Sequence, residues 1–108
     1  MKDDSIYIEH IIVSIERILF YIAEIDRSSF LKDLKTQDAV VRQLEIIGEA
    51  TKKISFDFRE KYPNIPWLDM AGMRDRLIHD YIDVDFEIVW KTASENIPQL
   101  KILLEEIE

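Results

Sequence analysis

The chain has 108 residues, of which 47% are apolar, so we expect one folded domain over residues 1–108 and neither a second core nor a disordered chain. The absence of cysteine excludes disulfides and thiol chemistry, and the net charge of −8 argues against general, non-specific nucleic-acid binding. No stretch has the pattern of a signal peptide or the roughly 18 apolar residues of a membrane span, which predicts a soluble cytoplasmic protein.

The first predicted helix runs from Ser5, a candidate cap, to about Ile25. Its main apolar stripe at helical spacing consists of Ile8, Ile11, Ile12, Ile15, Leu19 and Ile22. A second apolar line recurs every seven residues on another face, at Ile6, Val13 and Phe20. A helix that is apolar on two faces is buried on two sides. Two explanations stay open: a subunit interface, or a central place in a monomeric bundle.

The polar link IDRSSFLKDLKTQD has room for a short helical turn before a second long helix. That helix is predicted to start at Asp38 or Thr36 and to end near Ile54. Its core line consists of Val40, Leu44, Ile47, Thr51 and Ile54. The opposite face carries Arg42, Glu45, Ile46 and Glu49, as in a solvated face with a local ion pair. Gly48 costs about 1 kcal/mol inside a helix and, like Gly72, indicates a close approach between helices.

The second half of the chain reads as three further helical segments. A short one covers Asp57 to Tyr62, Pro63 and Pro66 break the pattern, and Trp67 opens a helix to about Tyr81. Asp85 caps the last helix, which Pro98 kinks or restarts. Its inward line consists of Phe86, Val89, Trp90, Ala93, Ile97, Leu100, Leu103, Leu104 and Ile107. No segment alternates with period two, so the sequence predicts an all-α antiparallel bundle of about four main helices.

The segment MRDRLIHDYIDVD places Arg74, His79 and Tyr81 on a helix otherwise patterned for the core. Tyr81 comes seven residues after Arg74, so both lie on one side of the helix, roughly 10 Å apart along its axis. His79 lies about 140° away from Arg74, and Asp75 shares its face. Arg74 and His79 therefore meet at one small ligand only if the helix bends or if two copies of the chain face each other.

Arg and His together allow cleavage of a phosphodiester bond without a metal ion. Arg holds a phosphate and stabilises its developing charge, while His moves the proton of a ribose 2′-hydroxyl or of the leaving oxygen. Glu49 has two interpretations, as a positioning group for Arg74 or a partner's His79, and as a surface glutamate. Spacing alone favours the simpler interpretation of the segment, an exposed His79 and an Arg74 in a structural ion pair.

The amino-acid sequence of the whole segment is more specific for one protein family than the spacing of its Arg, His and Tyr. The stretch from Trp67 to Tyr81, WLDMAGMRDRLIHDY, resembles the signature of HepT-like toxins in the HEPN superfamily, Arg, four residues, His, one residue, Tyr. The resemblance extends to RQLEIIGEA, residues 42–50, and to VDFEIVWKTASENIPQL, residues 84–100, and so covers most of the chain.

The resemblance implies an all-helical homodimer whose two motifs meet in a cleft, and a metal-independent endoribonuclease toxin without a cofactor. Arg74 and His79 would act on RNA, with Asp75 and Glu49 in support. The partner would be an MntA-type nucleotidyltransferase antitoxin of a type VII toxin–antitoxin system, which transfers AMP onto Tyr81. The acidic net charge leaves RNA affinity to a local patch, which consists of Arg42, Lys52, Lys53, Arg74 and Arg76. The alternative is a non-catalytic helical module that binds a nucleotide or assembles with a nucleotidyltransferase.

Overall fold

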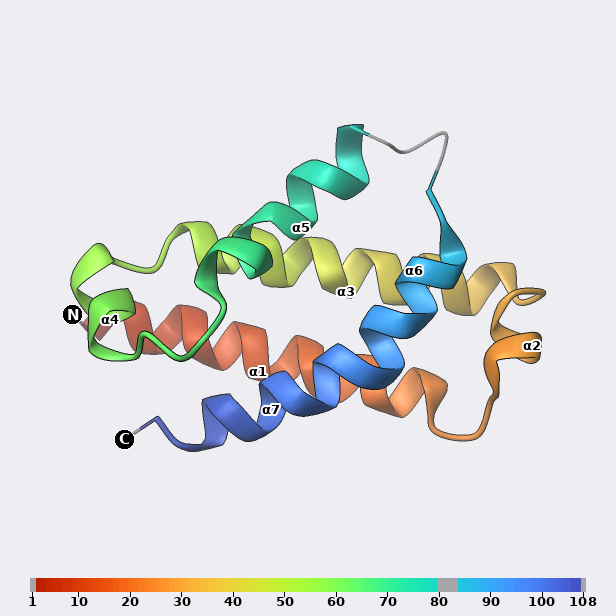
Figure 1. Ribbon diagram of the computed structural model, residues 1–108, viewed down its shortest axis with the longest axis horizontal. Helices are drawn as coiled ribbons and strands as arrows, with labels where there is room; N and C mark the ends of the chain where they lie inside the picture. Colours follow the sequence, from red (N-terminus) through yellow and green to blue (C-terminus); the bar gives the residue numbers. More distant parts are fainter. Residues whose placement is uncertain (1, 80–83, 108) are drawn as a thin grey trace.

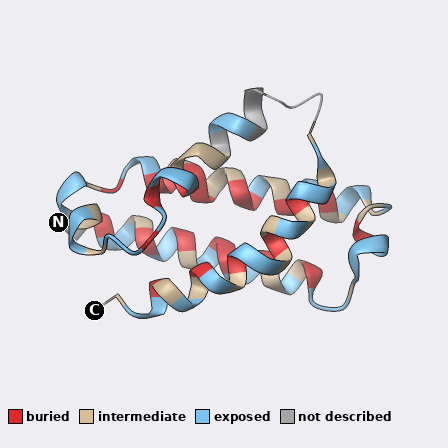
Figure 2. Cartoon of the chain, viewed as in Figure 1, coloured by how far each residue is buried: buried red, intermediate tan, exposed pale blue. Residues whose placement is uncertain are grey.

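Helices α1 (Lys2–Ile22) and α3 (Leu34–Lys52) pack along each other in the computed structural model, which describes residues 2–79 and 84–107. Within these ranges, the side chains of residues 2, 3, 74 and 77–79 lie outside the description. The predicted core line of α3 is buried, and that of α1 is buried except at Ile12 and Leu19, which are partly exposed (Figure 2). Ile11 and Ile15 of α1 and Ile47 of α3 are completely buried, so the helical spacing located the core correctly.

The other elements cover this pair. They are α2 (Arg27–Phe30), α4 (Phe56–Lys61), α5 (Trp67–His79), α6 (Phe86–Lys91), the π-helical turn η2 (Thr92–Asn96) and α7 (Ile97–Glu105). Helix α5 packs on α3, and η2 and α7 pack on α1 (Figure 1). No strand occurs in residues 2–79 and 84–107, which confirms the all-α bundle. None of the helices described is both long and apolar enough to cross a lipid bilayer.

Two predicted helix starts were wrong. Helix α1 is already helical at Lys2, so Ser5 lies inside it and is not its cap. Helix α3 begins at Leu34, ahead of Thr36 and Asp38, because Asp33 caps it. The Asp33 carboxylate accepts from the backbone N–H of Thr36 at 3.1 Å and from its hydroxyl at 2.6 Å, and these bonds lower the pKa of Asp33.

The second apolar line of α1 is exposed to solvent in the single chain. The exposed fractions are 49% for Ile6, 41% for Val13 and 79% for Phe20. Helix α1 is therefore buried on one side only, and its predicted central place in a monomeric bundle was wrong for this face. The other explanation, a subunit interface, stays a prediction.

Pro98 determines the shape of the last helical segment. Proline lacks an N–H and clashes with the carbonyl four residues earlier, so a regular α-helix cannot run through it. The chain widens into the π-helical turn η2, and α7 begins with Pro98 in its first turn. The predicted kink or restart thus takes the form of a π turn. Val89 before it, Ala93 within it, and Ile97, Leu100 and Leu104 after it are all buried.

A buried carboxylate joins the start of α1 to the start of α4. Asp4 is only 2% exposed, and it accepts from the backbone N–H and the hydroxyl of Ser55, both at 2.8 Å. Ser55 in turn caps α4 through Phe58. Burial is the largest single effect and opposes the charged form of Asp4, whereas the hydrogen bonds from Ser55 favour that form, and the net effect is a pKa of Asp4 below its ordinary range.

The two glycines do not share one explanation. Gly48 is buried within α3, as the expected close approach requires. A Cβ atom added at Gly72 would have nothing within 4 Å, so the close approach predicted at this position was wrong. Neither glycine has a positive φ.

Replacing Asp4 by Asn should lower the free energy of unfolding by about 1–2 kcal/mol at pH 7, because a charge-assisted pair of hydrogen bonds becomes a neutral one. The folded-state pKa is depressed, so this contribution is present above the unfolded-state pKa of about 3.9 and is lost as the pH falls. Urea unfolding between pH 3 and 7 measures the difference, with the exposed Glu16→Gln as control. A difference that grows towards pH 3 contradicts the assignment.

Replacing Gly72 by Ala should raise the free energy of unfolding by up to about 1 kcal/mol. Alanine restricts the unfolded chain and has higher helix propensity, and its methyl group meets no neighbour at this position. Thermal or urea unfolding checks the gain. The Gly48→Ala variant is the comparison, since this glycine is buried, and it should be less stable than the Gly72→Ala variant.

Candidate functional site

Helix α5 carries the motif and is anchored at its first turns. The Trp67 side chain is 6% exposed, and its indole N–H donates to the carbonyl of Tyr62 at 3.0 Å. Met70 is 1% exposed and packs in the core. The link with Pro63 and Pro66 is not helical, so α5 starts at Trp67 as predicted and runs obliquely across α3 (Figure 1).

Arg74 and His79 lie on one uninterrupted α-helix, since α5 extends from Trp67 to His79. Their backbone positions are therefore about 140° apart around its axis. The side chains of both residues lie outside the described part of the chain. Tyr81 also lies outside the described residues, so its predicted place on the Arg74 side stays a prediction.

Asp75 joins α5 to the end of α3. Its carboxylate accepts from the ammonium group of Lys52 at 2.6 Å, and the two side chains are 52% and 35% exposed. An ion pair this exposed contributes at most about 1 kcal/mol to stability. The pair nevertheless fixes where Asp75 lies, on the side of α5 that includes position 79.

Glu49 is half-buried on α3, the helix against which α5 packs. It precedes Lys52 by three residues, which places it within about 60° of Lys52 around the α3 axis. The predicted supporting residues Glu49 and Asp75 therefore belong to the same region between α3 and α5.

The predicted basic patch is not gathered in one place. Lys52 is paired with Asp75, while the ammonium group of Lys53 lies 5.9 Å from the ring centre of Tyr7 on α1. Arg76 lies against the last helical segment, and Arg42 is exposed on α3. Two of the expected cations therefore have partners of their own.

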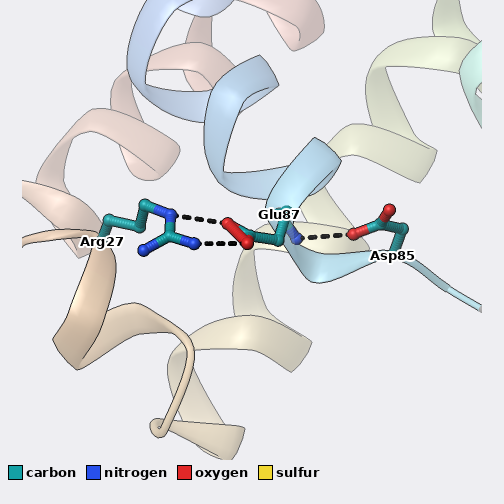
Figure 3. Close-up of polar contacts among 3 residues, drawn as sticks. All are labelled: Arg27, Asp85 and Glu87. Atoms are coloured by element: carbon teal, nitrogen blue, oxygen red, sulfur yellow. Dashed lines mark hydrogen bonds and ion pairs between the residues drawn. The ribbon is translucent and has the colours of Figure 1, made fainter.

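The chain is fixed again where it returns to the bundle after the motif. Asp85 caps α6, as predicted, by accepting from the backbone N–H of Glu87 at 2.9 Å. Both carboxylate oxygens of Glu87 accept from the guanidinium of Arg27 on α2, and Figure 3 shows this paired contact. Both ends of the motif segment are thus attached to the bundle, by Trp67 at one end and by Asp85 and Glu87 at the other.

A pocket of about 370 Å³ lies between α5, η2 and α7, on the side of α5 that carries Arg76. The residues that line it are Pro66, Asp69, Met70, Met73, Arg76, Thr92, Asn96, Ile97, Gln99, Leu100 and Leu103. The sequence did not predict this pocket, because its polar residues look like parts of two solvated faces. The sequence feature that could have indicated the pocket is the helical spacing of Thr92, Asn96, Gln99 and Leu103, which places polar and apolar side chains on one side of a helix.

Among the side chains described, no three His, Cys, Asp or Glu residues lie close enough together to hold a metal ion. The groups that the sequence singled out for chemistry are Arg74, His79 and Tyr81, and the structure gives the helix on which the first two are carried.

The comparisons with known proteins agree with one another. The family model of the HepT-like ribonucleases matches residues 11–107. A protein of Thermococcus cleftensis named "Probable ribonuclease HepT" is 52% identical over 101 residues, which are 94% of this chain and 92% of that protein. A relative in Caldanaerobacter subterraneus, named as an inferred RNase, is 43% identical over 99% of this chain and 96% of its own length. Another inferred RNase, from Methanocaldococcus jannaschii, is 42% identical over 98% of this chain and 91% of its own. No solved structure matches the chain significantly.

Proposed function

The chain belongs to the HepT-like ribonuclease family, and we propose that it is a metal-independent endoribonuclease in which Arg74 and His79 act on the RNA backbone. The observation that carries the proposal is the family match over residues 11–107, which includes α5 with both residues on one helix. The RNase names of its relatives support the same activity.

The two residue types supply the chemistry of such a cleavage. His79 takes the proton of the ribose 2′-hydroxyl, whose oxygen attacks the phosphorus and forms a 2′,3′-cyclic phosphate as the 5′-oxygen leaves with a proton. Arg74 binds the phosphate oxygens and stabilises the charge that develops on them. Histidine is the residue type that suits the transfer of a proton in both directions, which is why it is assigned this role.

The active form is a homodimer in this proposal. Positions 74 and 79 are about 140° apart on a continuous helix, so one chain does not turn both towards one phosphate. Two copies of α5 that face each other would place one copy's Arg74 beside the other copy's His79. The exposed apolar line of α1 supports self-association, since Ile6, Val13 and Phe20 form the kind of surface that subunit contacts cover.

Control by a nucleotidyltransferase completes the proposal and comes from the family resemblance alone. An MntA-type antitoxin would transfer AMP from ATP to Tyr81: the phenol oxygen attacks the α-phosphorus, pyrophosphate leaves and the phenol proton goes to solvent. If the helix continues to Tyr81, the added anion would lie on the Arg74 side and compete with RNA for that arginine.

The second candidate function is a non-catalytic module that assembles with a nucleotidyltransferase or binds a nucleotide. The net charge of −8 favours it, because the charge opposes the approach of RNA. The experiments below separate the two functions.

Replacing Arg74 or His79 by Ala should reduce RNA cleavage by about 10²-fold or more, because each removes a group that acts on the transition state. Cleavage of a labelled RNA by purified protein, with EDTA present throughout, measures the loss. Lys32→Ala removes an exposed cation from the link between α2 and α3, away from the apolar line of α1, and as the control it should cleave normally. An intact protein that cleaves no RNA would rule out the enzyme and leave the binding module.

Replacing Tyr81 by Phe should leave cleavage within about threefold of the parent, because the phenol oxygen takes no part in the reaction, and should abolish AMP transfer. Intact mass spectrometry after incubation with ATP and the nucleotidyltransferase detects the modification. Tyr21→Phe on α1 is the control and should accept AMP as the parent does. Loss of AMP from the control, or its persistence on the Tyr81→Phe variant, contradicts the assignment.

A further inference from the structure

The pocket between α5, η2 and α7 combines an apolar floor with a polar rim. Met73 and Leu103 are half-buried and form the floor, and the buried side chains of Met70, Ile97 and Leu100 lie beneath them. The rim consists of Asp69, Arg76, Thr92, Asn96 and Gln99. A volume of about 370 Å³ suits one small organic molecule, since such sites range from about 300 to 1,000 Å³.

The rim side chains are available to a ligand. Within residues 2–79 and 84–107, no ion pair or hydrogen bond involves the side chains of Asp69, Arg76 or Gln99. Asn96 precedes α7, and its amide makes no capping bond. The site thus offers a carboxylate, a guanidinium and two amides beside apolar side chains.

The charges lie at opposite ends of the pocket. Asp69 and Arg76 are seven residues apart on α5, so they lie on one side of the helix and about 10 Å apart along its axis. Arg76 is at the η2 end, because it also lines a smaller pocket with Val89 and Thr92. Helix α7 runs opposite to α5 (Figure 1). Gln99 follows Thr92 by seven residues, so we expect it at the Asp69 end of the pocket. A ligand that fits carries its negative charge at one end and hydrogen-bond donors at the other.

We propose that this pocket binds a guanine nucleotide, with the base on the apolar floor, its edge at Asp69 and its phosphate at Arg76. A carboxylate is an acceptor with two oxygens, and guanine alone among the four RNA bases presents two adjacent donors, N1–H and the 2-amino group. Adenine and cytosine offer one amino group beside an acceptor, and uracil offers one N–H between two carbonyls. Arg76 binds the phosphate through charge-assisted hydrogen bonds.

The pocket lies next to the proposed cleavage site. Arg76 precedes His79 by three residues, which is less than one turn of α5. A nucleotide held at Arg76 therefore directs its phosphate towards the motif end of the helix. That the nucleotide is part of an RNA substrate rests on the proposed ribonuclease function, whereas the binding chemistry does not depend on it.

Titration calorimetry on the full chain tests the pocket with GMP, IMP, AMP, CMP and UMP. GMP should bind at least tenfold more tightly than AMP, and IMP, which lacks the 2-amino group, should fall between them. The Asp69→Asn variant should lose this preference, because one acceptor becomes a donor. The Arg76→Gln variant should bind GMP about tenfold more weakly but guanosine unchanged.

Matched controls separate local effects from changes of charge or folding. Asp57→Asn removes an exposed carboxylate from the first turn of α4, as Asp69→Asn does in α5, and Arg17→Gln removes an exposed guanidinium from α1. Both should bind GMP as the parent does. Circular dichroism melting confirms that each variant folds. Equal affinity for GMP and AMP, or an Asp69→Asn variant that keeps the preference, overturns the proposal.

Two octanucleotides, U8 and the same RNA with one guanosine, identify the source of the ligand. Tighter binding of the guanosine octamer supports an RNA subsite, and GMP binding without that gain supports a free nucleotide in the same pocket. If the protein binds GMP in this way but cleaves no RNA, the proposed pocket is supported and the proposed ribonuclease function is contradicted. If the protein cleaves RNA but does not prefer GMP to AMP, the proposed ribonuclease function is supported and the proposed pocket is contradicted.

Discussion

The packing of α5 on α3 determines where the helix that carries Arg74 and His79 lies. The buried indole of Trp67 and the buried thioether of Met70 fix the start of α5, and Lys52 meets Asp75 further along it. A helix held at one edge of a bundle presents two usable sides. One side carries position 74, and the opposite side carries Arg76 above the pocket, so chemistry and recognition could share α5 without sharing residues.

Much of the fold could be predicted from the sequence because the core follows a simple period. The lines through Ile11 and Ile15 in α1 and through Val40 and Ile47 in α3 are buried as their spacing indicates. Helix starts were predicted less well, since several residues near each start are able to cap a helix. Spacing does not show that Asp33 receives the N–H of Thr36, nor that Asp4 is buried against Ser55, 51 residues away in the sequence.

The candidate site was found only in part. The order of Arg74, His79 and Tyr81 is local and visible in a sequence, whereas the pocket needs two helices that are distant in the chain. Asp69, Asn96 and Gln99 each look like ordinary surface residues until α5 and α7 are placed side by side. At Gly72 the sequence suggested a contact that the structure does not have. A glycine next to the motif indicated a close approach between helices, but nothing lies within 4 Å of its Cβ position.

The π turn before Pro98 also restricts how the length of this chain can change. A turn with hydrogen bonds between residues i and i+5 holds one residue more than an α-helical turn. One more residue inserted into Thr92–Asn96 would rotate α7 by about 100° relative to α6 and turn Leu100 and Leu104 away from the core. Deleting one residue would remove the extra residue of the π turn and leave a regular α-helical turn into which Pro98 does not fit. Changes of length would therefore be tolerated better in the links between helices than in this segment, although Thr92 and Asn96 line the pocket.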